Sequence, residues 1–232
     1  MFPKYKKILN FEVAHFNEKE LKLLQKEIFS NEIYKIKLDK NIPKIIDAGA
    51  YIGLSTLYFK TIYPKAKILS FEPNPNIFPL LEENIEINDL KGVTLKKLAL
   101  GNKKAIRNLY IDSSNNYSFS TSSFIKDAWN GEQHTSPIEV KVEKLSDYIS
   151  ENVDLLKMDI EGAEKEVLEE LRDSNKLHLI RNIIFEFHPS KINQLNHLKN
   201  ILSSNNMDIT IKEGLEGKKD PLILVIGKEI SN

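Results

Sequence analysis

Residues 44–53 read KIIDAGAYIG, a short apolar run that ends in an aspartate and in two glycines four positions apart. The apolar run predicts a buried strand over 44–47, and the residues from Ile52 to Tyr63 predict a helix that ends before Pro64. Glycine permits the tight turn and the close helix packing that such a junction needs. A strand, a glycine turn and a helix in this order predict the first unit of an open parallel α/β sheet.

The alternation of short apolar runs and amphipathic stretches continues along most of the chain. The last two apolar runs, 207–212 and 221–226, are joined by a glycine-containing turn that is too short for a crossover helix, so they should pair as an antiparallel hairpin. We therefore predict an α/β fold with a doubly wound, mostly parallel sheet, flanking helices and a C-terminal antiparallel hairpin. Further strands are predicted at 67–71, 93–100, 154–159 and 182–187, and further helices at 76–88, 163–172 and 192–202.

Two segments fall outside this alternation. Residues 1–40 combine a helical apolar pattern with a candidate strand at 33–38, and we interpret them as an N-terminal structural cap on the sheet. Residues 41–232 then form one domain, with a lid-like insertion at about 105–143 in which two β-like runs flank a polar stretch over 112–137. A stretch of that length is typical of a functional lid or of a disordered segment, and the sequence leaves both open.

The charge balance excludes several classes of partner. Lys and Arg together number 33, equal to Asp and Glu, so no net field would attract duplex nucleic acid or an acidic membrane surface. The chain has no cysteine, which excludes disulfides, thiol nucleophiles and thiolate metal sites. No apolar run approaches membrane-spanning length, and the first residues do not read as a cleaved leader. We expect a soluble cytoplasmic protein without a membrane or duplex nucleic-acid partner, and the oligomeric state stays open.

Ligands of an open parallel sheet bind beyond the carboxyl ends of its strands, so the residues there are the first candidates. Gly49 allows the backbone to approach a ligand closely, and Glu72, at the end of the next strand, can accept both hydroxyls of a ribose. Tyr51 stands where a dinucleotide site has its middle glycine, and its side chain would obstruct a pyrophosphate. The pattern favours a nucleoside cofactor without phosphates over a dinucleotide; the alternative is a solvated carboxylate beside a plain turn.

Four segments together resemble one known family. They are residues 45–53 (IIDAGAYIG), 71–75 (FEPNP), 99–102 (ALGN) and 156–164 (LKMDIEGAE), and they closely resemble the FkbM family of S-adenosylmethionine-dependent methyltransferases over about residues 45–188. The resemblance implies a class I, Rossmann-like fold with a seven-stranded mixed sheet. It also implies S-adenosyl-L-methionine as the cofactor and O-methylation of hydroxyls on sugars or secondary metabolites.

The resemblance further assigns contacts to the cofactor. It places Asp47 and Gly49 at the methionine end, Glu72 at the ribose, and the backbone around Ala99 and Leu100 beside the adenine. The cofactor-binding residues that we expect are Asp47, Gly49, Ala50, Tyr51, Gly53, Glu72, Pro73, Ala99, Leu100 and Asp159.

The reacting end should lie beyond the fourth and fifth predicted strands, where acidic residues gather. Methyl transfer from a sulfonium is an in-line displacement, so alignment and exclusion of water are the main demands. His188 is the most natural general base for an alcohol acceptor, with Asp159 or Glu186 to orient or replace it. These three residues and Glu161 could instead hold a magnesium or similar ion. Glu164 reads mainly as a helix cap, and a purely local hydrogen bond for His188 is also open.

We expect a methyltransferase that acts on a hydroxyl of a small-molecule or carbohydrate acceptor. Three alternatives stay open: methylation of nitrogen in a small molecule or in RNA, a catalytically weak module that binds the cofactor, and a dehydrogenase. A neutral chain with three arginines argues against RNA, and Tyr51 argues against a dinucleotide enzyme. All of these share one sheet architecture, so the fold alone does not separate them.

Overall fold

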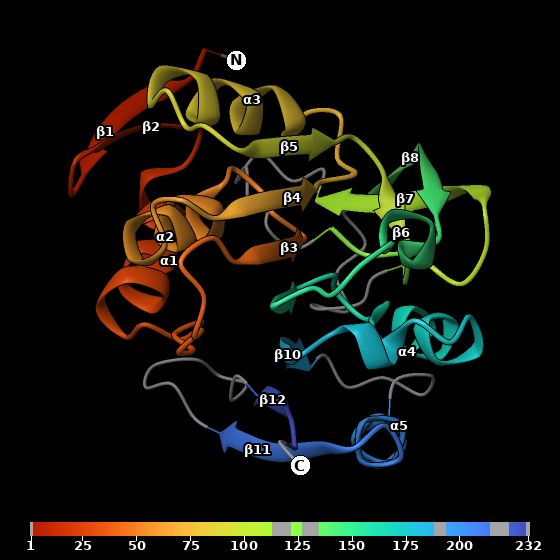
Figure 1. Cartoon of the computed structure of the whole chain (residues 1–232). Helices are drawn as coiled ribbons and strands as arrows, with labels where there is room; N and C mark the ends of the chain where they lie inside the picture. The colour runs from red at the N-terminus through yellow and green to blue at the C-terminus, as the bar shows by residue number, and fades with distance from the viewer. Residues whose placement is uncertain (1, 113–121, 127–134, 188–193, 214–222, 231–232) are drawn as a thin grey trace.

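The computed structural model describes residues 2–112, 122–126, 135–187, 194–213 and 223–230. Its centre is a seven-stranded sheet (Figure 1) with the strand order β11-β12-β10-β9-β3-β4-β5. Five of these strands pair in parallel, and β12 runs antiparallel to both of its neighbours. The strands are β3 (Lys44–Ala48), β4 (Lys67–Phe71), β5 (Val93–Lys96), β9 (Leu155–Met158), β10 (Asn182–Phe187), β11 (Met207–Glu213) and β12 (Ile223–Glu229).

The order of the strands reverses in the middle of the sheet. The chain moves outward from β3 to β4 and β5, and it then returns to place β9 and β10 on the other side of β3. In the register of the sheet, Asp47 on β3 lies between Ser70 on β4 and Lys157 on β9. The predicted doubly wound, mostly parallel sheet with an antiparallel end is therefore confirmed, and the reversal marks the place where such sheets bind ligands.

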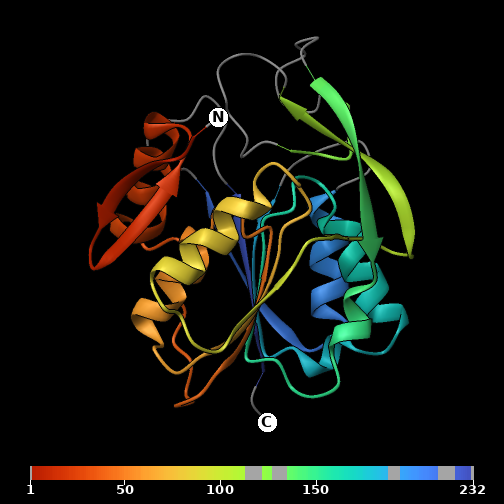
Figure 2. The same cartoon turned by 90° about the horizontal axis from the view of Figure 1, so that it is seen from above.

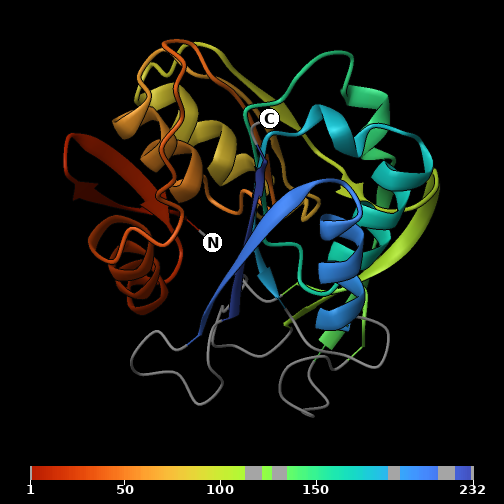
Figure 3. The same ribbon diagram turned by 60° about the horizontal axis from the view of Figure 1, so that its bottom comes forward.

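Helices cover both faces of the sheet (Figures 2 and 3): α2 (Leu54–Ile62) and α3 (Phe78–Ile87) lie on one face, and α4 (Glu164–Asp173) and α5 (Leu195–Ser203) on the other. Each helix packs an apolar stripe with helical spacing against the sheet. Two short 3-10 turns, η2 (Leu145–Tyr148) and η3 (Leu177–Leu179), precede β9 and β10 in the chain. Within the described residues, no helix has the length and apolarity needed to cross a membrane.

The N-terminal segment lies on the same side as α2 and α3 (Figure 2). It consists of a hairpin of β1 (Lys4–Ile8) and β2 (Phe11–His15), the helix α1 (Glu18–Gln25) and the π-helical turn η1 (Lys26–Ser30). The hairpin was not predicted, because residues 4–8 carry three lysines and read as a polar lead-in. Asn17 caps α1 by accepting the N–H groups of Lys19 and Glu20 at 3.0 and 3.3 Å.

The strand predicted at residues 33–38 is wrong, because this stretch has no strand partner in the described structure. Its apolar side chains are buried, which explains the apolar pattern. A side chain, and not a neighbouring strand, makes hydrogen bonds to the backbone of this stretch. The hydroxyl of Tyr63 donates to the carbonyl oxygen of Ile36 and accepts the N–H of Leu38 at 2.9 Å.

Two asparagines, one in α3 and one directly after it, hold the N-terminal hairpin. Asn84 is buried; its Oδ1 accepts the N–H of Ala14 at 2.6 Å, and its Nδ2 donates to the Ala14 carbonyl at 3.0 Å. One helical turn later, Asn88 makes the same pair of bonds with Glu12, at 2.9 and 2.8 Å. The two amide side chains therefore bond the backbone of β2 much as a neighbouring strand would.

The predicted strand at 93–100 is two strands in different sheets. After β5 the chain turns, with the N–H of Leu98 donating to the carbonyl of Lys96 at 3.0 Å, and β6 (Ala99–Leu100) enters a second sheet with the order β6-β8-β7. The two β-like runs of the insertion form the antiparallel pair β7 (Ala105–Asp112) and β8 (Thr135–Glu143). Of the polar stretch between them, only residues 122–126 are described, so the choice between lid and disorder lies largely outside the described residues.

Candidate active site

The loop after β3 lies at the centre of the predicted site. Gly49 has a φ of +76°, in the left-handed region, and a Cβ on it would come 1.7 Å from the carbonyl oxygen of Asp159. Only glycine fits at such a position. The N–H groups of Gly49 and Ala50 both donate to the carbonyl of Phe71, at 3.0 and 2.9 Å. The loops that follow β3, β4 and β9 are thus in direct contact.

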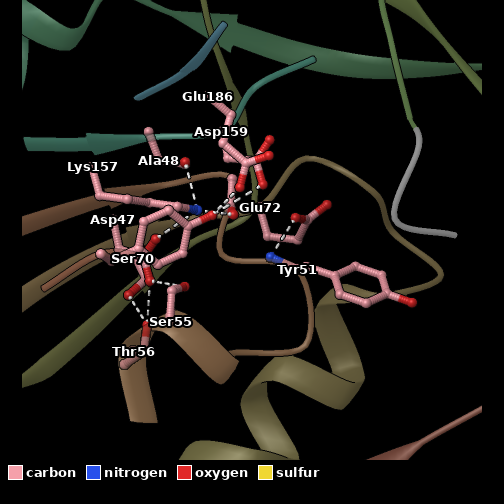
Figure 4. Close-up of polar contacts among 12 residues, drawn as sticks. Asp47, Ala48, Tyr51, Ser55, Thr56, Ser70, Glu72, Lys157, Asp159 and Glu186 are labelled. Carbon is pink, nitrogen blue, oxygen red and sulfur yellow. Dashed lines mark hydrogen bonds and ion pairs between the residues drawn. The ribbon is translucent and has the colours of Figure 1, made fainter. Parts of the chain in front are cut away.

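Tyr51 follows with a φ of +51°, a conformation that costs a non-glycine residue roughly 1 kcal/mol or more. Its N–H donates to Oε2 of Glu72 at 2.9 Å, and its hydroxyl donates to Oε2 of Glu20 on α1 at 2.7 Å. Burial, and then the charge of Glu20, raise the pKa of this hydroxyl well above its usual value, so it stays protonated. Figure 4 shows the ring directed away from the buried charges of the site. Bonds at both ends hold Tyr51 in this conformation.

Glu72 directly follows β4 and is only 6% exposed. Its Oε1 accepts the N–H of Asn74 at 2.8 Å, and its Oε2 accepts that of Tyr51. Burial raises the pKa of the carboxyl to about 7, although the two N–H donors and Lys157 act in the opposite direction. A carboxylate has about four acceptor positions, so Glu72 can still accept the hydroxyls of a ligand.

Asp47 and Lys157 form a fully buried ion pair, with Lys157 Nζ 3.2 Å from Asp47 Oδ1. Asp47 Oδ2 accepts the hydroxyls of Ser55 and Thr56 at 2.6 and 2.7 Å, while Lys157 Nζ also donates to the Gly49 carbonyl at 2.7 Å (Figure 4). Burial lowers the pKa of Lys157, but nearby carboxylates outweigh it and the net shift is upward, so the lysine stays charged. Through the bond of Lys157 to the Gly49 carbonyl, this ion pair stabilises the glycine loop.

Asp159, directly after β9, and Glu186, near the end of β10, lie together (Figure 4). The hydroxyl of Tyr34, from the N-terminal segment, donates to Glu186 Oε1 at 2.6 Å and lies 3.5 Å from Asp159 Oδ2. The Tyr34 ring also faces Lys157, whose Nζ is 5.2 Å from the ring centroid. Burial and the two carboxylates raise the pKa of Tyr34 well above its usual value, so it acts here as a proton donor in a hydrogen bond.

Two further acidic candidates, Glu161 and Glu164, lie in the loop after β9 and at the start of α4. His188 lies outside the described residues. Glu164, the first residue of α4, accepts at 3.1 Å the N–H of Gly162, which lies before the helix; the N-cap of α4 is Ala163 and makes no side-chain cap bond. Glu161 has a φ of +55° and follows β9 at the edge of the site. No three acidic or histidine side chains in the described part of the chain are grouped closely enough to hold a metal ion.

Two cavities meet at the glycine loop, and they share Leu24, Gly49, Tyr51 and Asp159. The larger has about 720 Å³ of space, including its open mouth, and the smaller about 340 Å³. The predicted cofactor residues that line the larger cavity are Gly49, Tyr51, Glu72, Pro73, Ala99, Leu100 and Asp159. Ala50 lines the smaller cavity with Glu186, whereas Asp47 and Gly53 line neither. Gly53 instead lets α2 approach α3, since a Cβ there would come 2.9 Å from Leu81.

Sequence reasoning missed the part of the insertion that covers the larger cavity. Leu109, Ser122 and Phe124 line it. The guanidinium of Arg107 stacks 3.9 Å from the centroid of the Phe124 ring and pairs with Glu166 at 2.7 Å. The local sequence gave no signal for this cover, because these residues reach the cavity only through the second sheet.

Comparisons with known proteins agree with this geometry. A family model described as the methyltransferase FkbM domain matches residues 47–209. The chain is 34% identical over 188 residues to Methyltransferase 1 of Beauveria bassiana, which covers 74% of this chain and 75% of that protein. It is 33% identical over 222 residues to Methyltransferase sdnD of Sordaria araneosa, and this match covers 82% of this chain and 83% of that protein.

A solved structure, methyltransferase FkbM from Methylobacillus flagellatus KT, superimposes on this chain with a TM-score of 0.57 and 17% identity. The superposition covers 80% of this chain and 44% of that one, so the chain spans less than half of that structure. At this identity the likeness concerns the fold.

Proposed function

The chain belongs to the FkbM methyltransferase family, and from that premise we propose that it transfers the methyl group of S-adenosylmethionine to a hydroxyl oxygen of a sugar or another small metabolite. The observation that carries the proposal is Glu72, a buried carboxylate that directly follows β4 beside the glycine loop and lines the larger cavity. A carboxylate at that position of an open α/β sheet is suited to accept the hydroxyls of a ribose.

The charge of the two cavities supports this cofactor over a dinucleotide. Glu72 and Glu161 line the larger cavity, Glu186 lines the smaller, and Asp159 lines both. Lys157 is the one basic residue among the described residues that line them. An electronegative site attracts the positive sulfonium of S-adenosylmethionine and repels a pyrophosphate.

The names of two further relatives support oxygen as the acceptor atom. The chain is 26% identical over 204 residues to the 31-O-demethyl-FK506 methyltransferase FkbM of Streptomyces tacrolimicus, over 76% of this chain and 78% of that protein. It is 27% identical over 146 residues to the 2-O-methyltransferase NoeI of Sinorhizobium fredii, over 56% and 58%. Both names describe methyl transfer to an oxygen atom.

Asp159 and Glu186 are the described residues best placed to serve the reacting end, because Asp159 lines both cavities and Glu186 lies beside it at the Tyr34 hydroxyl. The bound cofactor supplies an activated methyl group. The residues of the chain align the acceptor oxygen with it, exclude water and take the hydroxyl proton. One of the two carboxylates would accept the proton of the acceptor hydroxyl when the cofactor's methyl group is transferred. His188 is the third candidate for this role.

Titration calorimetry of the full chain with S-adenosylmethionine and with NAD tests the cofactor. We expect S-adenosylmethionine to bind and NAD not to bind. Glu72→Ala should weaken binding of S-adenosylmethionine by roughly 100-fold, because two ribose hydroxyls lose a charged acceptor. Glu82→Ala removes an exposed carboxylate from α3 and is the matched control, with wild-type affinity expected. Binding of NAD, or of neither ligand, contradicts the proposal.

The acceptor atom is tested separately. We would incubate the protein with S-adenosylmethionine labelled on its methyl group and with panels of sugars, phenols and amines of similar size. Label should appear on hydroxyl compounds as an acid-stable and base-stable ether. Transfer to amines alone would show that the family assignment holds while the proposed acceptor is wrong.

A further inference from the structure

The two edge strands of the central sheet differ in length. β5, at one edge, has four residues, and a short edge strand is one of the ways in which proteins avoid the addition of a further strand. β11, at the other edge, has seven residues, MDITIKE, and no proline (Figure 1). β12 pairs with the inner side of β11 over its whole length, and no other described strand pairs with the outer side. Within the part of the chain that the structure describes, the outer side of β11 is thus a template for a further strand.

The side chains of β11 alternate between the two faces of the sheet. Met207 and Ile209 pack into the core that also contains residues of α5. Three side chains point to the opposite face and are exposed: Asp208, Thr210 and Lys212. One acid and one base therefore lie on the same face of the edge strand, at equal distances in sequence from its central residue.

A second copy of β11 that pairs antiparallel about Thr210 matches this pattern of charges. In such a pair the two copies are related by a two-fold axis, Thr210 lies opposite Thr210, and all seven residues of each strand are paired. Asp208 of each copy then lies opposite Lys212 of the other, and pairs of opposite charge stabilise a pair of strands. A shift of the register by two residues places Thr210 opposite a charged residue and leaves two residues of each strand unpaired.

We propose that β11 is the interface of a homodimer, in which the β11 strands of two copies pair antiparallel about Thr210 and join the two central sheets. The β-branched residues over 209–211 favour an extended edge. β1 gives the contrast, since it carries three lysines and no acid, so that two copies of it repel each other. The dimer does not depend on the function proposed above, because Asp208 and Lys212 line neither cavity of the site.

The test is light scattering after size-exclusion chromatography, on the full chain over a wide range of protein concentration. The wild type should form a dimer whose share rises with concentration. Asp208→Lys places two lysines opposite each other at both ends of the interface, and Lys212→Asp places two aspartates there. Each of these variants should raise the Kd of the dimer by roughly 10- to 30-fold, because both symmetric pairs change from opposite to like charge.

An equal mixture of the two variants tests the register directly. When Asp208→Lys pairs with Lys212→Asp, every lysine again lies opposite an aspartate. The mixture should therefore dimerise with a Kd close to that of the wild type, although neither variant does so alone. A loss of folding in either variant cannot produce this mutual rescue.

Glu82→Lys is the control, because it makes the same change of charge at an exposed position of α3, which lies at the other edge of the sheet (Figure 1). It should dimerise like the wild type. Wild-type protein that stays monomeric up to its limit of solubility overturns the proposal, and so does a dimer that neither charge variant weakens. Weakening by both variants without rescue in the mixture overturns the pairing about Thr210. Binding of S-adenosylmethionine enters none of these outcomes, so the proposed function stands or fails separately.

Discussion

The ends of β3 and β4 lie side by side and each carries an acid, but the two carboxylates have different surroundings. Asp47 is fully buried, paired with Lys157 and bonded by two hydroxyls. Glu72 is bonded by two backbone N–H groups and lines the larger cavity, and burial raises its pKa to about 7. The charge of Asp47 is compensated within the protein, whereas that of Glu72 is compensated only in part. Of two neighbouring acids at one sheet edge, Asp47 therefore stabilises the glycine loop, while Glu72 remains available to a ligand.

Removal of Asp47 should give the largest effect. Asp47→Ala should lower the free energy of unfolding by about 3–5 kcal/mol, because Lys157 would keep a buried charge without its closest partner. Glu72→Ala should cost less than half of this, since a buried carboxylate with a raised pKa contributes little net stability. Urea unfolding of both variants measures the difference. Equal losses for the two variants would show that both acids have the same structural role.

The pH dependence of stability sharpens the same comparison. The pKa of Glu72 is about 7 in the folded chain against a usual value of 4.5. Between these values the folded carboxyl keeps a proton that the unfolded chain has released, so the free energy of unfolding should fall as pH rises, by about 3 kcal/mol across the window.

Glu72→Gln should lack this contribution. The variant should therefore become more stable relative to the wild type, by about the same amount, when urea unfolding is compared at pH 4.5 and at pH 7.5. A difference between the two proteins that does not change with pH would mean that the pKa of Glu72 is the same in the folded and the unfolded chain.

The smallest expected effect concerns Tyr51, which connects the two regions to the N-terminal segment. Tyr51→Phe keeps the backbone N–H bond to Glu72 and loses the hydroxyl bond to Glu20. We expect a loss of about 1–2 kcal/mol in the free energy of unfolding, because a hydrogen bond to a charged group is removed. Affinity for S-adenosylmethionine should change by less than a factor of about three. A large loss of affinity with unchanged stability would place the hydroxyl itself at the ligand.

The sheet and the glycine loop could be predicted because their signals are local. Short apolar strands bounded by glycine and proline, separated by helical stretches, predict parallel strands, and parallel strands bring their carboxyl ends together. This is why Gly49, Glu72 and Asp159 were expected at one place and are found around one cavity. The parallel pairs β3–β4 and β3–β9 fit the alternation of strands and helices in the sequence.

The rest of the site depends on contacts that no local pattern encodes. Tyr34 bonds Glu186 across 152 positions of sequence, and residues 33–38 look like a strand because their apolar side chains are buried without one. Lys157 lies in a strand that is buried throughout, and its charge is tolerated because acids from other strands surround it. Such contacts depend on which strands and loops are neighbours in the folded chain, and the sequence alone did not show this arrangement.

The pairing of Asn84 and Asn88 with β2 has a consequence for how the protein behaves in a concentrated solution. The free edge of a strand is a template on which another chain can add a strand, and exposed hairpins are prone to this. Here the amide side chains bond the backbone of Ala14 and Glu12 on one edge. The strand on the other edge, β1, carries three lysines whose charges repel a second copy. The N-terminal hairpin is thus protected against intermolecular strand addition, and the segment can serve the site without becoming a start point for aggregation.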